Sequence, residues 1–400
     1  MNILYISSVC AQSRFDRLVA KKHINGQFQN QKFHHLLIEG LIDSGKTAIS
    51  VVSFYPINRV EGVKLSNEQE IEDGVYYVYP KYVNKPVLHH IIKFVQTYKS
   101  LNKLRRPDSI IVCNIMNFDE CLAALVYRCF HKIRICAITA DVPGITSGSG
   151  KNVGTWWKRM LRGMTYPLYK AMSSRYDAYM FLSQAMNDVV NPKDKPYIVV
   201  EGLADLSMQN TDNSLEGKYP KKTVMYAGGL HREYGIALLV EAFRKIKDQN
   251  VELHIYGKGN YENELTRVAE EDHRIKYLGT KPNAEIVAAQ IKAHILINPR
   301  PTAAEFVKYS FPSKIMECMA SGTPLLTTRI PSMPDEYYPH IFTFDEETVD
   351  GFHKTLQYTL SLSDEELHEK GRAAKEFILK EKNYKVQAAK LRSLLMKMSS

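Results

Sequence analysis

A run of small, cationic and acidic residues between Tyr309 and Pro324 could bind a diphosphate and the ribose attached to it. The run reads Tyr-Ser-Phe-Pro-Ser-Lys-Ile-Met-Glu-Cys-Met-Ala-Ser-Gly-Thr-Pro and follows a short apolar segment. Ser310 is a good N-cap and Pro312 suits the first helical turn, so a helix is expected to begin here and to end at Gly322. Because such a helix follows a strand, its free N–H groups would face the crevice where phosphates bind.

Glu317 in this run is a candidate for contacting the ribose. It lies four residues after Ser313 and three after Lys314, on the helix face that begins at the phosphate end. A carboxylate there can accept hydrogen bonds from both ribose hydroxyls, and a surface ion pair is the alternative interpretation. The candidate donor-binding residues of the run are Tyr309, Ser310, Phe311, Pro312, Ser313 and Glu317.

Two glycine loops precede this run, each directly after an expected strand, at residues 227–235 and 256–259. Glycines let the backbone approach a ligand closely, and neighbouring polar side chains can add contacts. Many such loops are ordinary turns, so their position after a strand is what favours a ligand. The residues of these loops expected to contact a nucleotide are Gly228, Gly229, His231, Arg232, Gly257 and Gly259.

The elements that would position these residues alternate between short apolar runs and longer segments of helical period, the pattern of parallel sheets built from βαβ units. The expected strands are 2–7, 48–54, 75–79, 109–114, 133–139, 178–182 and 197–201, followed by 223–227, 252–256, 275–278, 295–298, 324–328 and 341–344. The expected helices include 31–41, 90–104, 236–247, 262–270, 284–293, 311–320, 349–362, 364–381 and 384–398.

The chain has 400 residues, enough for two cores. We expect an α/β protein of two doubly wound, Rossmann-like lobes that face a cleft. Residues 1–204 would form the first lobe, 205–220 a polar linker, 221–382 the second lobe, and 383–400 a helix that can pack back on the first lobe.

Charge is distributed unevenly between the two halves. Residues 1–200 carry 26 Lys and Arg against 15 Asp and Glu, so the surplus of +10 belongs to the first half. The stretch Lys151–Arg175 contains no acid and includes Trp156 and Trp157, which suits a helix at an anionic membrane surface, although a partly buried helix with a basic face is an equal alternative. No signal peptide, 18-residue apolar run or C-x-x-C pair is found. We therefore expect a cytoplasmic protein, peripheral at the inner face of the membrane.

Together these residues resemble glycosyltransferase family 4, whose retaining enzymes have the two-lobed GT-B fold. Residues 310–324 match the family's donor helix, residues 228–235 and the pair Gly257 and Gly259 match its glycine loops, and Gly26 and residues 140–143 match first-lobe landmarks less specifically. The resemblance is to members that build bacterial polysaccharides. It implies hexosyl transfer from a nucleotide sugar, without a cofactor, to a saccharide or lipid-linked acceptor.

Two departures from the family pattern affect the donor site. The family has two glutamates eight positions apart, whereas this chain has Tyr309 and Glu317, and the usual Arg and Lys of the first glycine loop are replaced by Gly229 and Tyr234. Positive charge for the diphosphate would then come from nearby cationic residues, and a carboxylate or a phenol would contact the sugar. The expected contributors are Arg300, Lys308, Lys314 and Arg232 for the charge and Glu305 or Tyr309 for the sugar.

The expected mechanism uses these cations instead of a metal. Sugar transfer leaves growing negative charge on the departing diphosphate, and the sequence has no D-x-D pair to hold a divalent ion. Arg300, Lys308 and Lys314 would stabilise that charge. In the first lobe, Asp141 is the strongest candidate near the reacting carbon, although an Asp before Val-Pro is often a turn residue. Weaker candidates there are Asn117, His34 and His35.

Two other function classes fit the same sequence. One is another GT-B chemistry, a sugar-nucleotide epimerase or a phosphorylase. The other is a non-catalytic protein that binds a membrane or a nucleotide. Nucleic acid is not expected as a partner, because the second lobe is not basic and no nucleic-acid motif is present.

Overall fold

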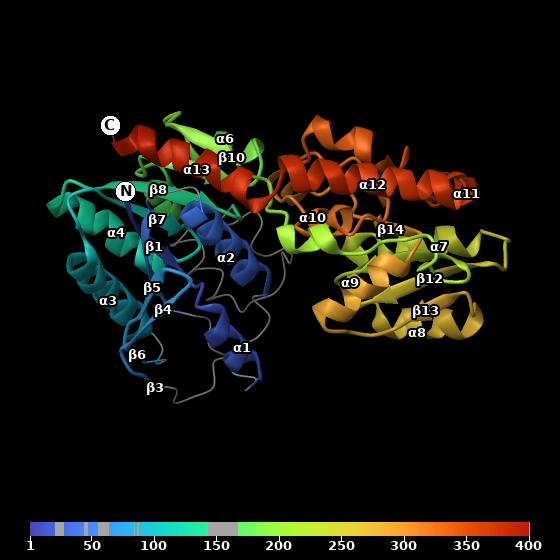
Figure 1. Cartoon of the computed structure of the whole chain (residues 1–400), viewed down its shortest axis with the longest axis horizontal. Coiled ribbons are helices and arrows are strands. Elements are labelled where there is room, and N and C mark those ends of the chain that lie inside the picture. The colour runs from blue at the N-terminus through green and yellow to red at the C-terminus, as the bar shows by residue number, and fades with distance from the viewer. Residues whose placement is uncertain are drawn as a thin grey trace. The chain divides into compact units, whose positions relative to one another are not determined.

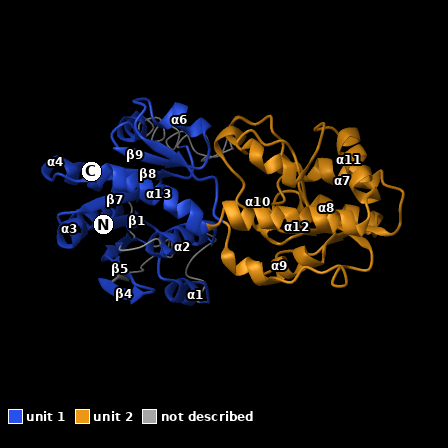
Figure 2. Ribbon diagram, turned by 45° about the horizontal axis from the view of Figure 1, so that its top comes forward, with its two compact units in different colours: residues 1–203, 384–400 blue, residues 204–383 orange. Residues whose placement is uncertain are grey.

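The computed structural model describes residues 1–20, 28–43, 47–54, 64–83, 85, 88–142 and 167–399, which form two compact units (Figures 1 and 2). Unit 1 comprises Met1–Leu203 and Tyr384–Ser400, and unit 2 comprises Ala204–Asn383. No helix in these described ranges is both long and apolar enough to cross a membrane.

Unit 1 contains an eight-stranded sheet in the order β10-β9-β8-β7-β1-β2-β5-β4, parallel except for the edge strand β4. Its strands are β1 (Asn2–Ser7), β2 (Ala48–Ser53), β4 (Glu68–Glu72), β5 (Val75–Tyr79), β7 (Ser109–Asn114), β8 (Arg134–Thr139), β9 (Ala178–Phe181) and β10 (Tyr197–Val199). A separate pair joins β3 (Lys64–Leu65) to β6 (Tyr82–Val83). Strands β1 and β7 are buried along their whole length, as expected for a parallel sheet covered on both faces.

The helices of unit 1 pack on the two faces of its sheet (Figure 1). They are α1 (Gln12–Ala20), α2 (Phe28–Asp43), α3 (Leu88–Leu104), α4 (Phe118–Phe130), α6 (Ala185–Val190) and α13 (Tyr384–Ser399), and residues 167–173 are also helical.

Unit 2 contains a six-stranded parallel sheet in the order β13-β12-β11-β14-β15-β16. Its strands are β11 (Lys222–Ala227), β12 (Val251–Tyr256), β13 (Ile275–Tyr277), β14 (Ile295–Asn298), β15 (Leu325–Thr327) and β16 (Phe342–Thr343). Its helices are η1 (Leu206–Asn210), η2 (Arg232–Tyr234), α7 (Ile236–Arg244), α8 (Glu262–Glu271), α9 (Asn283–Lys292), η3 (Glu305–Tyr309), α10 (Lys314–Ala320), η4 (Asp335–His340), α11 (Val349–Ser361) and α12 (Asp364–Glu381). Both sheets add strands first to one side of their opening strand and then to the other, so the predicted doubly wound α/β fold is confirmed.

The C-terminal helix α13 packs on α2 within unit 1 (Figure 1). A side chain at Gly40 would lie 2.6 Å from the carbonyl oxygen of Tyr384, so the glycine permits the close approach. Polar contacts flank it, because the Tyr384 hydroxyl donates to Glu39 at 2.7 Å and Lys385 pairs with Asp43 at 2.8 Å.

Residues 205–220, expected as a linker, lie within unit 2. Lys218 in this stretch is partly buried and donates hydrogen bonds to the side chain of Asn213 and to the carbonyl oxygens of Ile291 and Ala293. Burial lowers the pKa of Lys218 to about 8. The lysine therefore ties the stretch to the end of α9.

Candidate functional site

The sheet of unit 2 changes direction between β11 and β14, and a ligand crevice is expected at the carboxyl ends of these two strands. Strand β11 ends at Ala227 and leads into the first glycine loop, while β14 ends at Asn298 and leads into the segment that carries Arg300. The topology therefore brings together two of the segments that the sequence indicated.

The two glycine loops continue the pairing of β11 with β12 beyond the sheet. The Gly228 N–H donates to the carbonyl oxygen of Tyr256, and the Leu230 N–H donates to that of Lys258, both at 2.9 Å. Gly257 has a φ of 132°, and a side chain there would lie 1.7 Å from the carbonyl oxygen of Gly228. Glycine at 257 is therefore required by the backbone, whichever ligand the loops bind.

Lys314 places its ammonium at this switch point. Its ammonium donates a hydrogen bond to the carbonyl oxygen of Ala227 at 2.9 Å, and a side chain at Gly228 would come within 2.7 Å of its Nζ. Burial lowers the pKa of Lys314, against the opposing effects of Cys318 and Glu317. An ammonium has three N–H donors, and Ala227 is the acceptor found among the described residues, so donors remain for a ligand.

The Tyr226 side chain stabilises the first glycine loop. Its hydroxyl donates to the carbonyl oxygen of Gly229 at 2.8 Å, and burial raises the pKa of Tyr226 above its ordinary range. Because Tyr226 falls within the expected strand 223–227, the sequence gave no sign of this contact.

The segment after β14 is held at several points by side chains from other elements. Glu347 accepts hydrogen bonds from the backbone N–H of Thr302 at 2.9 Å and from its hydroxyl. The Ser332 hydroxyl donates to the carbonyl oxygen of Ser310 at 3.0 Å, and Thr328 donates to that of Arg300 at 2.5 Å. Sequence patterns could not reveal these anchors, because they are single polar residues distant along the chain.

Arg300 and Ser310, both predicted as donor-site residues, are in contact. Arg300 donates to the Ser310 hydroxyl at 3.4 Å, and its guanidinium lies 5.0 Å from the ring centroid of Phe306. The guanidinium is thus fixed beside the residues that lead into α10.

The helix predicted to start at Ser310 begins later, at Lys314. Ser310 has an extended backbone (φ −130°, ψ 107°), and the residue before α10 is Ser313, whose side chain makes no cap. The prediction of Ser310 as N-cap is therefore wrong. Proline disfavours helical conformation in the residue before it, so Pro312 keeps Phe311 out of the helix. The resulting helix has only seven residues.

The other predicted residues of this run take different environments. Phe311 is buried against Tyr337, with 5.6 Å between ring centroids, so only its backbone could meet a ligand. Glu317 is half-buried, three residues after Lys314. Glu305, Lys308 and Ser313 are exposed, whereas Tyr309 and Pro312 are half-buried.

The polar residues of the first glycine loop have partners of their own. Arg232 pairs with Glu264 of α8, and its guanidinium lies 5.2 Å from the ring centroid of Tyr261. His231 packs edge-on against Tyr234, with 5.2 Å between ring centroids. Arg232 would have to leave Glu264 to contact a diphosphate, which gives Lys314 and Arg300 the stronger claim to that role.

The second glycine loop is held by Glu262, which the sequence did not single out. Its carboxylate accepts from the Gly259 N–H at 2.6 Å and from the Tyr277 hydroxyl at 3.1 Å. The carbonyl oxygen of Gly257 lies 3.1 Å from the same hydroxyl, so the single Tyr277 proton is shared between Glu262 and Gly257. Glu262 and Tyr277 therefore hold Gly257 and Gly259 beside the first loop.

In unit 1, Asp141 is half-buried just after β8, at the carboxyl edge of the sheet, as the sequence indicated. Asn117 precedes α4 and lies at the same edge, where its side chain donates to Glu120 at 3.5 Å. Pro143, Gly26 and most of the stretch Lys151–Arg175, including Trp156 and Trp157, lie outside the described residues.

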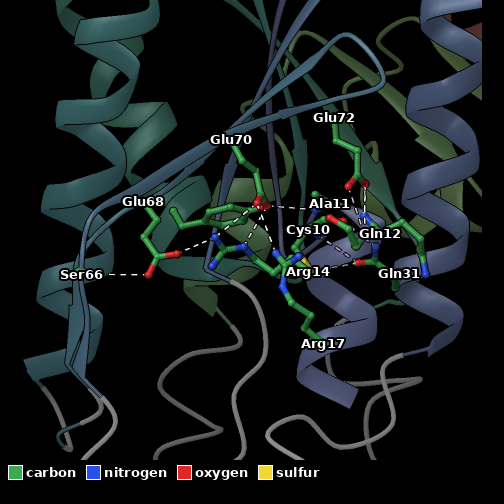
Figure 3. A network of polar contacts seen from close by, with 12 residues as sticks. Cys10, Ala11, Gln12, Arg14, Arg17, Gln31, Ser66, Glu68, Glu70 and Glu72 are labelled. Carbon is green, nitrogen blue, oxygen red and sulfur yellow. Dashed lines mark hydrogen bonds and ion pairs between the residues drawn. The ribbon is translucent and has the colours of Figure 1, made fainter. Parts of the chain in front are cut away.

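A charged network occupies the same edge of unit 1 (Figure 3). Arg14 lies between Glu68 at 2.6 Å and Glu70 at 2.9 Å, while Glu72 accepts hydrogen bonds from the backbone N–H groups that open α1. The pKa of Glu68 is lowered chiefly by its hydrogen bond with Arg14. The network fastens α1 to the edge strand β4, and no sequence signal predicted it. Within the described residues, no group of three or more His, Cys, Asp or Glu could hold a metal ion.

Comparison with known proteins places this geometry in a family. Residues 221–361, which include both glycine loops and α10, match the family described as "Glycosyl transferases group 1". The chain is 31% identical over 117 residues to the amylovoran biosynthesis glycosyltransferase AmsK of Erwinia amylovora, covering 28% of this chain and 29% of AmsK. It is 29% identical over 111 residues to the putative colanic acid biosynthesis glycosyltransferase WcaL of Escherichia coli K12, covering 26% and 27%. The matches thus span less than a third of these relatives.

Among solved structures, the UDP-forming α,α-trehalose-phosphate synthase of Burkholderia xenovorans is similar in fold. The TM-score is 0.68 at 13% identity, over 100% of this chain and 99% of that one. This similarity shows that the chain has the GT-B fold. The match identifies residues 221–361 as a segment of the group 1 glycosyltransferases, and the shared fold extends over the whole chain.

Proposed function

We propose that the protein transfers a sugar from a nucleotide-sugar donor, held at the carboxyl edge of the unit 2 sheet, to an acceptor bound by unit 1. The observation that carries the proposal is the half-buried ammonium of Lys314 at the switch point between β11 and β14, next to Gly228. A partly desolvated cation with unused donors favours an anionic group such as a diphosphate. The name of the structurally similar synthase, UDP-forming, is consistent with such a donor.

In the proposed reaction, the bond between the anomeric carbon and the diphosphate oxygen breaks while an acceptor hydroxyl oxygen attacks that carbon. The hydroxyl proton passes to a phosphate oxygen of the departing diphosphate. Lys314, Arg300 and Lys308 would stabilise the charge on the leaving group without a metal ion, and Asp141 would lie near the reacting carbon. Retention of configuration belongs to the proposal through the family resemblance.

The acceptor we propose is a saccharide or a lipid-linked saccharide of a surface polysaccharide. The names of AmsK and WcaL both refer to polysaccharide biosynthesis, which supports this class of product. The cellular place would be the cytoplasmic face of the membrane.

The surface of unit 1 supports docking on an anionic membrane. Unit 1 carries 30 Lys and Arg against 16 Asp and Glu, a net charge of +14, whereas unit 2 has a net charge of −4. Helix α3 contains no acid and exposes Leu88, Ile91 and Val95, which are spaced to share one helical face. Lys99 continues that face. Apolar and basic groups in line are typical of helices that lie on a membrane.

A panel of nucleotide sugars tests the proposal, with melting temperature and release of the free nucleoside diphosphate as readouts. We expect one donor to raise the melting temperature and to be slowly hydrolysed, in the presence of a chelator as well. Interconversion of the donor's sugar without release would indicate an epimerase, and release only with added phosphate would indicate a phosphorylase. A protein that binds no donor would contradict the proposal.

A further inference from the structure

The sheet of unit 1 has its own switch point, between β1 and β7, and a chain of neutral polar side chains lies there. Strand β1 leads into Ser8, and β7 ends at Asn114. Helix α2 contributes Asn30 and His34 to the same place. Carboxyl ends of strands at a switch point are where open α/β sheets bind ligands.

The orientation of the Asn114 amide is fixed by the backbone. Its Oδ1 accepts a hydrogen bond from the Met116 N–H at 3.1 Å, so its amino group faces the other way. That amino group donates to His34 Nε2 at 2.9 Å and lies 3.5 Å from the Oδ1 of Asn30. His34 Nε2 must therefore be an acceptor, which places the imidazole proton on Nδ1.

His34 holds the inner end of this chain as a neutral group. Its Nδ1–H donates to the Tyr5 hydroxyl, with 2.6 Å between the heavy atoms. The side chain is fully buried, and burial lowers the pKa of His34 to about 3. The imidazole therefore stays neutral at physiological pH, and the direction of the hydrogen bonds does not change.

The outer end of the chain is Ser8. Because Asn30 Oδ1 faces the amino group of Asn114, its own amino group donates to the Ser8 Oγ, at 2.9 Å. Ser8 is half-buried, and its hydroxyl proton has no acceptor among the described residues. The chain of hydrogen bonds therefore prepares Ser8 to donate to a ligand.

We propose that Ser8, oriented by Asn30, binds a saccharide hydroxyl oxygen of the acceptor. This inference rests on the proposed function and gives the acceptor a location in unit 1. The chain Tyr5–His34–Asn114–Asn30–Ser8 contains no charge. The charged network at the same edge has three carboxylates, Glu68, Glu70 and Glu72, and its two cations, Arg14 and Arg17, are paired with them (Figure 3). A neutral hydroxyl fits such surroundings, whereas a phosphate or carboxylate lacks an uncommitted cation among these groups.

Two substitutions test the direction of the chain in the full-length protein. Ser8→Ala removes the donor. Asn30→Asp should reverse the bond between Asn30 and Ser8, because the new carboxylate can accept from both Asn114 and Ser8, so the Ser8 proton turns inward. Ser100→Ala and Asn102→Asp on α3 serve as matched controls.

The probes are a panel of methyl glycosides, followed by saturation-transfer NMR, and a nucleoside diphosphate titrated separately. We expect at least one glycoside to bind both test variants about three- to tenfold more weakly than wild type, the range for one neutral hydrogen bond. The control variants should bind that glycoside as tightly as wild type does. Nucleotide affinity should not change in any variant. Equal glycoside binding in wild type and both variants, or no glycoside binding in a protein that binds the nucleotide, would overturn this inference. Absence of nucleotide binding would instead contradict the proposed function.

Discussion

The ammonium of Lys314 and the carbonyl oxygen of Ala227 are 2.9 Å apart, so the first turn of α10 is joined to the end of the central strand β11. The contact holds a cation at the switch point of the unit 2 sheet, beside the backbone of Gly228. Neither residue is unusual by itself. In the function we propose, this pairing would give the donor site its positive charge, in place of the Arg and Lys that the family pattern has in the first glycine loop.

Two glycines with positive φ allow the effect of close contact to be separated from that of backbone strain. Gly257→Ala should disrupt both glycine loops, because the new Cβ would lie 1.7 Å from the carbonyl oxygen of Gly228. Gly279→Ala is the matched control, since it has a φ of 68° and nothing within 4 Å of the new Cβ. We expect the control to cost about 1 to 2 kcal/mol in the free energy of unfolding, and Gly257→Ala to cost more and to abolish nucleotide binding. Equal losses measured by urea denaturation would refute this account of the loops.

Glu317 should contact the ribose of the donor. Glu317→Ala is expected to weaken binding of a ribonucleoside diphosphate by about 1.5 to 3 kcal/mol, as for hydrogen bonds to a charged group, without lowering the melting temperature. The loss should be smaller for the 2′-deoxy nucleotide. Titration calorimetry of both nucleotides provides the measurement, with the exposed Glu285→Ala on α9 as control. The same loss for both nucleotides would place the ribose elsewhere.

His34 should make stability depend on pH in the acid range. Its pKa is about 3 in the folded protein, below the ordinary 6.5, so the unfolded chain binds a proton that the folded chain does not. The stability from neutral His34 is fully present above pH 6.5 and decreases as pH falls toward 3, by about 1.4 kcal/mol per pH unit. Between pH 7.5 and 5.0, wild type should lose about 2 kcal/mol that His34→Gln does not lose.

Urea unfolding at the two pH values measures this difference. His273→Gln, at an exposed position, should behave as wild type. Identical losses in wild type and His34→Gln would show that another group governs the acid response.

Docking of unit 1 on anionic membranes should depend on both charge and apolar contact. Wild type should co-sediment with anionic liposomes more than with neutral ones, and salt should weaken the binding, since each basic residue near the surface contributes about 1 kcal/mol. The change of Lys158, Arg159 and Arg162 to Glu should reduce binding.

The double variant Ile91→Asn and Val95→Asn on α3 should reduce the part of the binding that survives high salt. Ile71→Asn, at a residue 75% exposed on the edge strand β4, is the matched control. Equal binding of wild type to both kinds of liposome would mean that this face is an ordinary solvated surface.

The strands that read as continuous apolar runs could be predicted from the sequence almost to the residue. Strands β1, β5, β7 and β14 have the predicted bounds, because continuous apolar runs in a parallel sheet have few alternatives. Strand β4 was missed. It reads Glu-Gln-Glu-Ile-Glu, and its one large apolar residue, Ile71, is exposed. Pairing with β5 and contacts with Arg14 define it, and neither is visible as a local pattern.

The candidate site was predictable in its segments but not in its side-chain geometry. Gly228 and Gly257 could be singled out because each lies in a loop directly after an expected strand. The sequence could not show that Arg232 pairs with Glu264 or that Glu347 holds the segment after β14, because these partners are 32 and 45 residues distant in the chain. The start of α10 was misplaced because the restriction imposed by Pro312 on the residue before it outweighed the capping preference of Ser310.

The most direct test of the account is calorimetric titration of wild type and Lys314→Met with a nucleoside and with its diphosphate. Lys276→Met, half-buried on the edge strand β13, is the control. If Lys314 binds the diphosphate, its loss should weaken diphosphate binding by about 1.5 to 3 kcal/mol and leave nucleoside binding unchanged, because only the charged ligand uses the ammonium. Equal affinities of wild type and Lys314→Met for the diphosphate would contradict the placement of the donor at this switch point.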